Sequence, residues 1–343
     1  MNGKLSIGKD VPSFKQYFGN FSYRFRYSIY EAVYKNATGK TLHEKELLKA
    51  HEEFKPDMWY INTIVMPEYA QLAIKLGVPY AVHVHELPQE YDFQPYEGFR
   101  QMLDHAIVRL CASETVVENL NDMGYEAVVM HGLINVEDIQ VKQDRAELRR
   151  KLGIPENAFV WLMSGAWSPR KGFDYMPQLL RHLPQDTYFV WMGSARKTAY
   201  TYYVERYTKQ FRQNVIFLTE QAEHYYDYFN CCDGFALTSR EDSYPIVMRE
   251  AAVLGKPIVG FSSGGITEFV KPGMGEVVEG FNVREMAAAM QRVMTGETPV
   301  SETVLRNAIT PDLMRKQGQR WSQVLEKAMN RTPTSDPLLS VAQ

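Results

Sequence analysis

The chain has 343 residues, of which 45% are hydrophobic and 23% charged, a globular composition long enough for two domains with a core each. The formal net charge of −3 argues against a nucleic-acid-binding protein, because such proteins carry a basic excess. The three cysteines fit neither a disulfide framework nor a zinc site, so we expect the protein to reside in a reducing cytoplasm. The sequence shows no run of about 18 apolar residues and no signal-peptide pattern, so we expect neither a membrane span nor export by that route.

Aromatic and basic residues dominate the segment 14–34. The aromatic side chains recur at helical spacing from Tyr23 to Tyr34 but also alternate from Phe21 to Tyr27, so periodicity leaves helix and strand open, and we favour helix. An aromatic face packed on its own domain is more common than a helix in the membrane interface. We therefore expect packing, with peripheral contact at the inner membrane face as the alternative.

Short apolar runs alternate with helical patterns from about residue 45 onward, which predicts βαβ units and an α/β fold with parallel sheets. The predicted strands are 58–63, 80–84, 106–112, 127–131, 159–164, 188–192, 215–218, 234–238 and 257–261. A charged helix over 143–152, ended by the glycine and proline of 153–155, opens a new unit, so we place a domain boundary near 140. The second half then forms one doubly wound domain of ordinary size.

The C-terminal part of the chain carries one further helical pattern. Apolar residues recur at helical spacing between Leu313 and Leu325 and include Trp321, which predicts an amphipathic helix. Residues 331–343 have the composition of a frayed tail.

An acidic turn followed by a helix occupies 238–252, the most informative segment of the chain. Pro245 suits the first helical position, and Gly255 with Pro257 ends the pattern, which predicts a helix near 245–254. Free backbone N–H groups and the positive end of the helix dipole attract an anion at such a helix start. A phosphate group fits there.

Glu250 lies inside this helix among apolar residues, so its carboxylate is expected to be screened from water. An unpaired buried carboxylate costs several kcal/mol, so this one needs donors. Arg249, Lys256 or the hydroxyl groups of a ligand could supply them. In an isolated helix a solvated or internally paired glutamate is the favoured interpretation.

The spacing of Asp242 and Glu250 resembles the E-x7-E signature of glycosyltransferase family 4, also called glycosyl transferases group 1. Members of this family are mostly retaining enzymes of the GT-B fold that use nucleotide sugars. They most often have Glu at the first acidic place, so Asp242 is a departure, and Glu241 beside it is an alternative. The resemblance implies that the first acid binds hydroxyl groups of the donor sugar and that Glu250 holds the ribose. The residues whose backbone it brings near the donor phosphates are Tyr244, Pro245 and Ile246, and Ser243 beside them is also expected to bind the donor.

A second segment resembling the family follows the first strand of the second half. Its loop begins at Gly165 and ends in Lys171 and Gly172, as the family's loop does, and we expect a helix to begin near Phe173. The resemblance implies that Lys171 neutralises a diphosphate leaving group, the charge that develops when a sugar-phosphate bond breaks. The family usually has Arg directly after the first glycine, but Ala166 stands there, so Arg170 is the candidate for the missing cation.

Two more segments resemble the family's donor site. Gly264 and Gly265 match its Gly-Gly-x-x-Glu loop, although glycine also suits the backbone angles of a turn. Leu218 and Thr219 end a strand where the family cradles the nucleobase.

His83 and His85 belong to the strand predicted at 80–84 and the loop after it, and their two-residue spacing puts them on the same side. A lone histidine on a strand is usually packed in a core. The family often carries a histidine here that contacts the donor sugar, and His85 matches it best, with His83 as the fallback. The H-x-H spacing fixes no third ligand, so no metal site is predicted.

We therefore expect a GT-B glycosyltransferase, with two Rossmann-like doubly wound α/β domains that face a cleft and a reduced N-terminal domain. The expected parts are 1–140 on the acceptor side, 141–310 for the nucleotide sugar, a helix at 311–330 that packs back on the first domain, and a flexible tail at 331–343. The expected reaction moves a sugar from a nucleotide diphosphate sugar, such as a UDP- or GDP-sugar, to a glycan, lipid or small-molecule acceptor. The resemblance implies retention of configuration, no bound cofactor or metal, and a role in glycan or polysaccharide biosynthesis. Asp242, His85 and Lys171 are the expected catalytic residues.

Two rival functions remain open at this point. A nucleotide-sugar 2-epimerase of GT-B fold would release an altered sugar without an acceptor, and a degenerate glycosyltransferase would act as a non-catalytic nucleotide-binding subunit. Because few residues precede the first matched helix, we also expect a shortened first domain completed by a partner chain, another copy or a membrane surface that contacts Tyr17–Tyr34.

Overall fold

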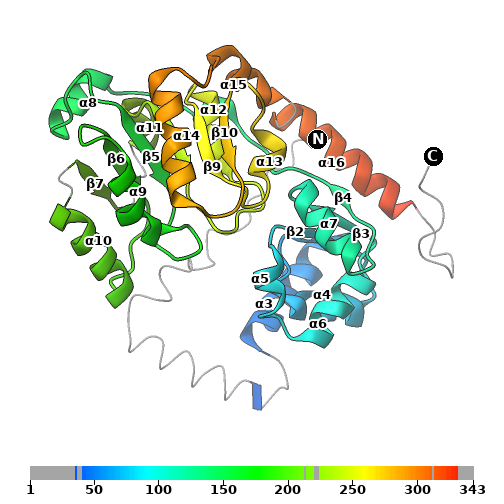
Figure 1. Ribbon diagram of the computed structural model, residues 1–343. Coiled ribbons are helices and arrows are strands. Elements are labelled where there is room, and N and C mark those ends of the chain that lie inside the picture. The colour runs from blue at the N-terminus through cyan, green and yellow to red at the C-terminus, as the bar shows by residue number, and fades with distance from the viewer. Residues whose placement is uncertain (1–34, 37–40, 212–213, 220–223, 311–312, 331–343) are drawn as a thin grey trace. The chain divides into compact units, whose positions relative to one another are not determined.

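The structure is a computed structural model, which describes residues 35–36, 41–211, 214–219, 224–310 and 313–330 (Figure 1). Contacts divide the chain into two units, 1–59 and 60–343, and each is described by itself. The aromatic segment 14–34 and the tail 331–343 lie outside the described residues, so the predictions made for them remain predictions.

The first unit contains helix α3 (Leu42–Phe54), which begins with a capping box. The Thr41 hydroxyl accepts from the Glu44 N–H at 3.0 Å, and the Glu44 carboxylate accepts from the Thr41 N–H at 2.7 Å. These bonds satisfy N–H groups that a helix start otherwise leaves unpaired. The helix has no buried residue.

The first sheet has four strands in the order β1-β2-β3-β4, and its β2–β3 and β3–β4 pairs are parallel. Its strands are β1 (Trp59–Ile61), at the boundary of the two units, β2 (Tyr80–Val84), β3 (Val108–Cys111) and β4 (Val128–Val129). The intervening helices are α4 (Pro67–Leu76), α5 (Pro88–Tyr91), α6 (Tyr96–Asp104) and α7 (Glu114–Asp122).

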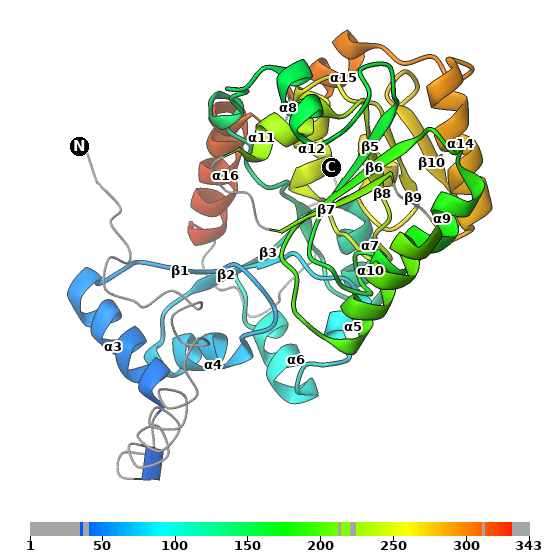
Figure 2. The same cartoon turned by 90° about the vertical axis from the view of Figure 1, so that its left-hand side faces the viewer.

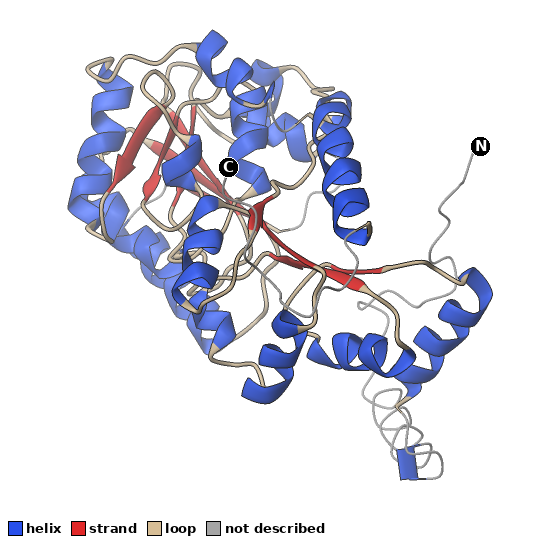
Figure 3. Cartoon of the chain, turned by 90° about the vertical axis from the view of Figure 1, so that its right-hand side faces the viewer, coloured by secondary structure: helices blue, strands red, loops and turns tan. Residues whose placement is uncertain are grey.

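The second sheet has six parallel strands in the order β10-β9-β8-β5-β6-β7. They are β5 (Val160–Ser164), β6 (Tyr188–Met192), β7 (Val215–Leu218), β8 (Gly234–Leu237), β9 (Ile258–Phe261) and β10 (Gly275–Val278). Numbered along the chain from the β7 edge, this order is 3-2-1-4-5-6, which is that of a doubly wound Rossmann sheet. Figure 3 shows the strands in red among the flanking helices.

Helices cover both faces of the six-stranded sheet. Figure 2 shows α9, α10 and α14 on one side of it and α8, α11 and α12 on the other. The bounds are α8 (Arg145–Lys151), α9 (Met176–His182), α10 (Ala199–Phe211), α11 (Tyr225–Cys231), α12 (Ile246–Val253), α13 (Ile266–Phe269), α14 (Val283–Thr295), α15 (Glu302–Ala308) and α16 (Met314–Met329). Short 3-10 helices are η1 (Val136–Asp138) and η2 (Phe173–Tyr175).

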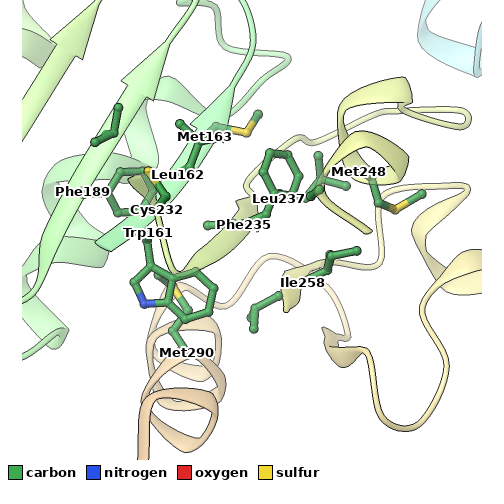
Figure 4. Close-up of a cluster of buried hydrophobic side chains, with 14 of the residues drawn as sticks. Trp161, Leu162, Met163, Phe189, Cys232, Phe235, Leu237, Met248, Ile258 and Met290 are labelled. Carbon is green, nitrogen blue, oxygen red and sulfur yellow. The ribbon is translucent and has the colours of Figure 1, made fainter. Parts of the chain in front are cut away.

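The core of this sheet is built from large side chains that are fully buried. Trp161 of β5 and Phe235 of β8 are 0% exposed, and Figure 4 shows them beside Met248 of α12 and Met290 of α14. Gly234 lies against the Trp161 ring so closely that an added Cβ would stand 2.5 Å from it. Burial of each such side chain contributes about 1.5–3 kcal/mol, so this cluster stabilises the frame that holds the loops above it.

The amphipathic helix predicted between Leu313 and Leu325 is present as helix α16. Its Trp321 ring lies 5.2 Å from the ring of Tyr60 in β1 and 5.4 Å from the ring of His83 in β2. Gln317, one turn earlier, is only 3% exposed. The C-terminal helix therefore contacts strands of the first sheet through an aromatic side chain.

Every run predicted as a strand contains one, which confirms the α/β fold with parallel sheets. The strand β10 was not predicted, because Gly275–Val278 carries a glycine and a glutamate and its first three residues are only half-buried. The boundary predicted near 140 falls between the strands of the two sheets and stays a prediction.

Two helix predictions need a correction of detail. Pro245 is the N-cap residue of α12, with ψ of 126°, and the first helical residue is Ile246. The helix predicted to begin near Phe173 begins as the 3-10 turn η2 and becomes α-helical at Met176. Among the described helices, none is both long and apolar enough to cross a bilayer.

Candidate functional site

The loops singled out in the sequence follow β5 and β8, the two central strands of the six-stranded sheet. At this point the strand order reverses, because β6 and β7 lie on one side of β5, whereas β9 and β10 lie beyond β8. In doubly wound sheets ligands bind at the carboxyl ends of the strands at such a switch point. The sequence-predicted residues at 165–172 and 238–246 therefore lie at this switch point.

Lys171 and Asp242 form an ion pair between these loops. Their side chains are 13% and 11% exposed, so water screens the pair only in part. The same Asp242 oxygen accepts from the Ser239 hydroxyl at 2.9 Å, and the Thr238 hydroxyl donates to the Lys171 carbonyl at 2.8 Å. The carboxylate and the ammonium are thus held by both side-chain and backbone contacts.

Arg240 contacts the loop that carries Arg170 and stabilises its position. Its N–H donates to the Arg170 carbonyl at 2.8 Å, and its guanidinium pairs with Asp174 at 2.7 Å. The guanidinium also lies 4.0 Å from the centre of the Tyr175 ring. Arg170 itself donates to the Glu241 carbonyl at 3.0 Å, so its side chain lies toward the acidic turn.

Gly264 and Gly265 allow two loops to touch. Gly264 forms an isolated parallel bridge with Asp242, and the Asp242 N–H donates to the Ser263 carbonyl at 2.8 Å. A Cβ on Gly265 would stand 2.2 Å from the Ser243 carbonyl oxygen. Glycine is required here for close approach of the backbone, and the donor-site role of this motif stays a prediction.

Glu250 is 8% exposed and accepts two tyrosine hydroxyls. Tyr226 donates to Oε1 at 2.9 Å and Tyr225 to Oε2 at 3.2 Å. Burial raises the pKa of Glu250, although both tyrosine hydroxyls and the charge of Arg249 pull that pKa down. Arg249, Lys256 and the hydroxyl groups of a ligand were the expected donors, and the two tyrosines are donors that the sequence analysis did not expect. The Lys256 ammonium instead donates to the Asn230 carbonyl at 3.2 Å.

His83 and His85 lie on the same side of β2, as their spacing predicts, with ring centres 3.9 Å apart. His83 is fully buried and its Nδ1 is bonded to the Tyr60 hydroxyl. Burial and the neighbouring His85 lower the pKa of His83 to about 3, so this ring is neutral at physiological pH. His85 is more open: its Nε2 hydrogen bonds Asn62 Oδ1 at 2.8 Å, and burial lowers its pKa.

A cavity of about 360 Å³ brings part of the predicted site together. It is lined by Val65, His85, Glu86, Leu87, Glu90, Arg170, Glu241, Asp242 and Ser243. This volume lies at the small end of ligand pockets, which range over roughly 300–1,000 Å³. Of the two histidines, His85 lines the cavity and His83 does not, and the role of either one toward a donor sugar stays a prediction.

Other predicted residues, among them Lys171 and Glu250, do not line this cavity. Tyr244 stacks on His131 with ring centres 4.1 Å apart. Leu218 ends the edge strand β7, where its carbonyl accepts from the Gly193 N–H at 3.0 Å, and Thr219 follows it. Gly165 lies against the Lys171 side chain, and its carbonyl accepts from the Trp191 indole at 3.1 Å.

The sequence analysis missed the tyrosine pair that holds Glu250. Tyr225 and Tyr226 precede Glu250 by 25 and 24 residues and stand in no recognisable motif with it. The available signal was indirect: an apolar helix with one carboxylate requires donors from a neighbouring element.

Comparison with known proteins matches residues 144–310 to the family described as glycosyl transferases group 1. A GDP-mannose-dependent monoacylated alpha-(1-6)-phosphatidylinositol monomannoside mannosyltransferase of Corynebacterium glutamicum is 32% identical over 159 residues, 42% of this chain and 40% of that protein. A D-inositol 3-phosphate glycosyltransferase of Xylanimonas cellulosilytica is 30% identical over 131 residues, 37% of this chain and 31% of that protein. The chain thus spans less than half the length of these two relatives.

Solved structures resemble a larger part of the chain. Anabaena Alr3699/HepE, crystallised in complex with UDP-glucose, superposes with a TM-score of 0.73 at 19% identity, covering 84% of this chain and 82% of that one. Sucrose-phosphate synthase from Thermosynechococcus elongatus gives a TM-score of 0.71 at 14% identity, with 83% and 77% covered. The two parallel sheets correspond to the two Rossmann-like domains of this architecture. The chain therefore has the GT-B fold, and its residues 144–310 match the glycosyl transferases group 1 family.

Proposed function

We propose that this chain is a glycosyltransferase that moves a hexosyl unit from a nucleotide diphosphate sugar to a hydroxyl group of an acceptor. The observation that carries the proposal is the Lys171–Asp242 ion pair at the switch point, beside a cavity that His85 also lines. A cation suited to a diphosphate and a carboxylate suited to sugar hydroxyls would then lie side by side. The match of residues 144–310 to the family supports the same reaction class.

In this reaction the bond between the anomeric carbon and the diphosphate oxygen breaks, and the acceptor oxygen bonds to that carbon. Lys171, with Arg170 and the N–H groups at the start of α12, stabilises the negative charge on the departing diphosphate. Asp242 and His85 accept or donate hydrogen bonds to the sugar and orient it. Glu250, farther along α12, accepts the hydroxyls of the ribose.

The names of the compared proteins indicate which donors to test first. The C. glutamicum mannosyltransferase is named as GDP-mannose-dependent, and the Anabaena structures contain UDP or UDP-glucose. We propose a UDP- or GDP-sugar as the donor of this chain.

The decisive experiment measures binding of UDP and GDP by calorimetry and slow hydrolysis of UDP-glucose and GDP-mannose by the full chain. Binding of one nucleotide together with release of that nucleotide from its sugar supports the proposal. Failure to bind either nucleotide, by a chain whose circular dichroism shows it folded, contradicts it. Release of an altered free sugar as the main product would instead favour the 2-epimerase, and binding without any turnover would favour the non-catalytic subunit.

Two mechanistic features extend the proposal. We propose retention of the anomeric configuration, which proton NMR of the first product tests directly. We also propose that no divalent metal is needed, because side-chain cations and a helix start balance the leaving group. Activity that disappears with a chelator and returns with magnesium or manganese would contradict this second feature.

The acceptor and the cellular location form a separate proposal. We propose a glycan, a lipid or a small molecule as acceptor, in the cytoplasm or at the inner membrane face, with a partner surface, a second copy or a lipid surface completing the acceptor side. Liposome flotation and light scattering on the purified chain test this part. A monomer that ignores liposomes and still transfers sugar at an ordinary rate, about 1–10³ per second, would contradict it.

A further inference from the structure

The two oxygens of the Glu250 carboxylate are each bonded to a different tyrosine. Tyr225 and Tyr226 are the first two residues of α11, and their rings stand nearly perpendicular, at 77° with centres 5.1 Å apart. This geometry lets neighbouring residues reach opposite sides of one carboxylate, with Tyr226 on Oε1 at 2.9 Å and Tyr225 on Oε2 at 3.2 Å. Glu250 thus has a fixed orientation and not only a charge.

Both tyrosines keep their protons under all ordinary conditions. Burial and the charge of Glu250 raise the pKa of Tyr225 and of Tyr226 well above the ordinary tyrosine value. Each hydroxyl therefore remains a donor to the carboxylate. Tyr225 is braced further, since its hydroxyl lies 2.9 Å from the hydroxyl of Ser164, the buried last residue of β5.

The hydrogen-bonding capacity of the carboxylate is only half used. An ionised carboxylate offers about four lone-pair sites, two on each oxygen, and the tyrosines occupy one on each. One acceptor site therefore remains on each oxygen. Two adjacent acceptors in one plane match a pair of hydroxyls on neighbouring carbons, which is the pattern that a ribose presents and a 2′-deoxyribose lacks.

We propose that Tyr225 and Tyr226 are positioning residues that aim the Glu250 carboxylate at both ribose hydroxyls, so that the site selects ribonucleotides over 2′-deoxyribonucleotides. The inference rests on the proposed function, because it requires a nucleotide in this domain. It goes beyond that function because it assigns the selection of ribose over 2′-deoxyribose in the nucleotide to residues of α11.

Loss of a tyrosine hydroxyl acts on Glu250 in two ways. The carboxylate gains freedom to rotate, which weakens any two-point contact with a diol. Its pKa also rises further, because both tyrosine bonds lower it. As pH is lowered, nucleotide binding is then lost at a higher pH in the variant than in the natural chain, because the protonated acid accepts fewer hydrogen bonds.

The test compares UDP with 2′-deoxy-UDP, and GDP with 2′-deoxy-GDP, on the full chain by calorimetry. The natural chain is expected to prefer the ribose form about tenfold or more, as a charge-assisted hydrogen bond predicts. Tyr226→Phe and Tyr225→Phe are expected to reduce that preference at least about threefold, with little change in affinity for the deoxy form. The pH midpoint of ribonucleotide binding should rise in both variants.

Tyr228→Phe is the matched control, because Tyr228 is in the same helix and packs against the core. It should leave the preference unchanged. An unchanged preference in both test variants, or an equal loss of affinity for the ribose and deoxy forms, would overturn the inference. If the natural chain binds no nucleotide, the proposed function fails as well, so the two failures are distinguishable.

Discussion

Lys171 and Asp242 are 71 residues apart in the sequence, yet their side chains form an ion pair across the switch point of the sheet. The two loops are joined a second time where the Thr238 hydroxyl bonds the Lys171 carbonyl at 2.8 Å. In the reaction we propose, a diphosphate that enters beside this pair would compete with Asp242 for the ammonium. The carboxylate would then be free to accept hydroxyls of the sugar attached to the same diphosphate.

Replacement of Lys171 is expected to weaken nucleotide binding. A charge-assisted hydrogen bond contributes about 1.5–3 kcal/mol, so Lys171→Ala should reduce affinity for UDP or GDP by roughly ten- to a hundredfold. Lys209→Ala is the control, because this lysine pairs with Glu205 on the surface helix α10. Calorimetry on both variants decides the matter, and an affinity equal to that of the natural chain would remove Lys171 from the site.

Replacement of Glu250 by its neutral isostere is expected to stabilise the fold at neutral pH. Burial raises the pKa of Glu250 above its ordinary value. Between that ordinary value and the raised one, the folded state binds more protons than the unfolded state, so stability falls as pH rises through this window. The ionised carboxylate is therefore a cost to the fold that remains in full above the raised pKa.

The measurement is the melting temperature of the natural chain and of Glu250→Gln across pH. The variant should melt higher at pH 7.5, and the difference should shrink as pH falls toward the ordinary carboxyl pKa. Nucleotide affinity should fall in the same variant. A variant that melts lower than the natural chain at pH 7.5 would show that the two tyrosine bonds outweigh burial of the charge.

Much of the fold follows from local pattern, because each strand of the six-stranded sheet except β10 is a short apolar run. The strand β5 and the strand β6 are fully or almost fully buried and read as such in the sequence. The strand β10 at the sheet edge is half-buried and begins with a glycine of φ 138°, so no run of apolar residues marks it. Its position depends on pairing with β9, which is a tertiary contact.

The candidate site was predictable only in part, and for a different reason. Lys171, Asp242 and Glu250 were predicted by resemblance to family motifs. Their spacing in the sequence does not indicate that Lys171 and Asp242 are in contact. The contact of Tyr226 with Glu250 joins two helices packed on one face of the sheet, so no periodicity within one helix contains it. Pairs of this kind are visible only in the folded chain.

Asp227, which follows Tyr226 in α11, is expected to be a major contributor to stability. It is 2% exposed, and its Oδ1 accepts the N–H groups of Lys142 and Gln143 at 2.6 and 3.0 Å. Burial alone would raise the pKa of Asp227, but these backbone bonds and His224 outweigh it and hold the pKa below its ordinary value. A buried carboxylate with a depressed pKa stabilises the fold above the ordinary pKa, and this contribution is lost as pH falls through the depressed one.

Asp227→Ala should therefore reduce the free energy of unfolding by about 2–4 kcal/mol at pH 7, because two backbone donors lose their acceptor. Urea denaturation measures it, with the exposed Asp186→Ala as control. Asp227→Asn should also be less stable than the natural chain at pH 7, with the difference decreasing in acid. A loss below 0.5 kcal/mol, which is the size of an ordinary surface substitution at about ±0.5 kcal/mol, would mean that water replaces the carboxylate.

Gly172 tests whether close approach of the two loops is needed for the site. Its φ is +72°, and an added Cβ would stand 2.1 Å from the Thr238 carbonyl oxygen. Gly153 has nearly the same φ, +70°, but no atom within 4 Å of its added Cβ, so it provides a control for backbone strain alone. Gly153→Ala should cost about 1–2 kcal/mol from the left-handed backbone. Gly172→Ala should cost about 1–3 kcal/mol more, because the chain must also move apart.

The displacement caused by Gly172→Ala should separate Lys171 from Asp242 and so weaken nucleotide binding, whereas Gly153→Ala should leave affinity unchanged. Urea denaturation and calorimetry on the two variants separate the effect on the fold from the effect on the site. Equal losses of stability in both would show that the loops accommodate a methyl group between them. Full nucleotide affinity in a destabilised Gly172→Ala would show that the ion pair does not depend on this contact, and the case for Lys171 and Asp242 as one functional unit would then fail.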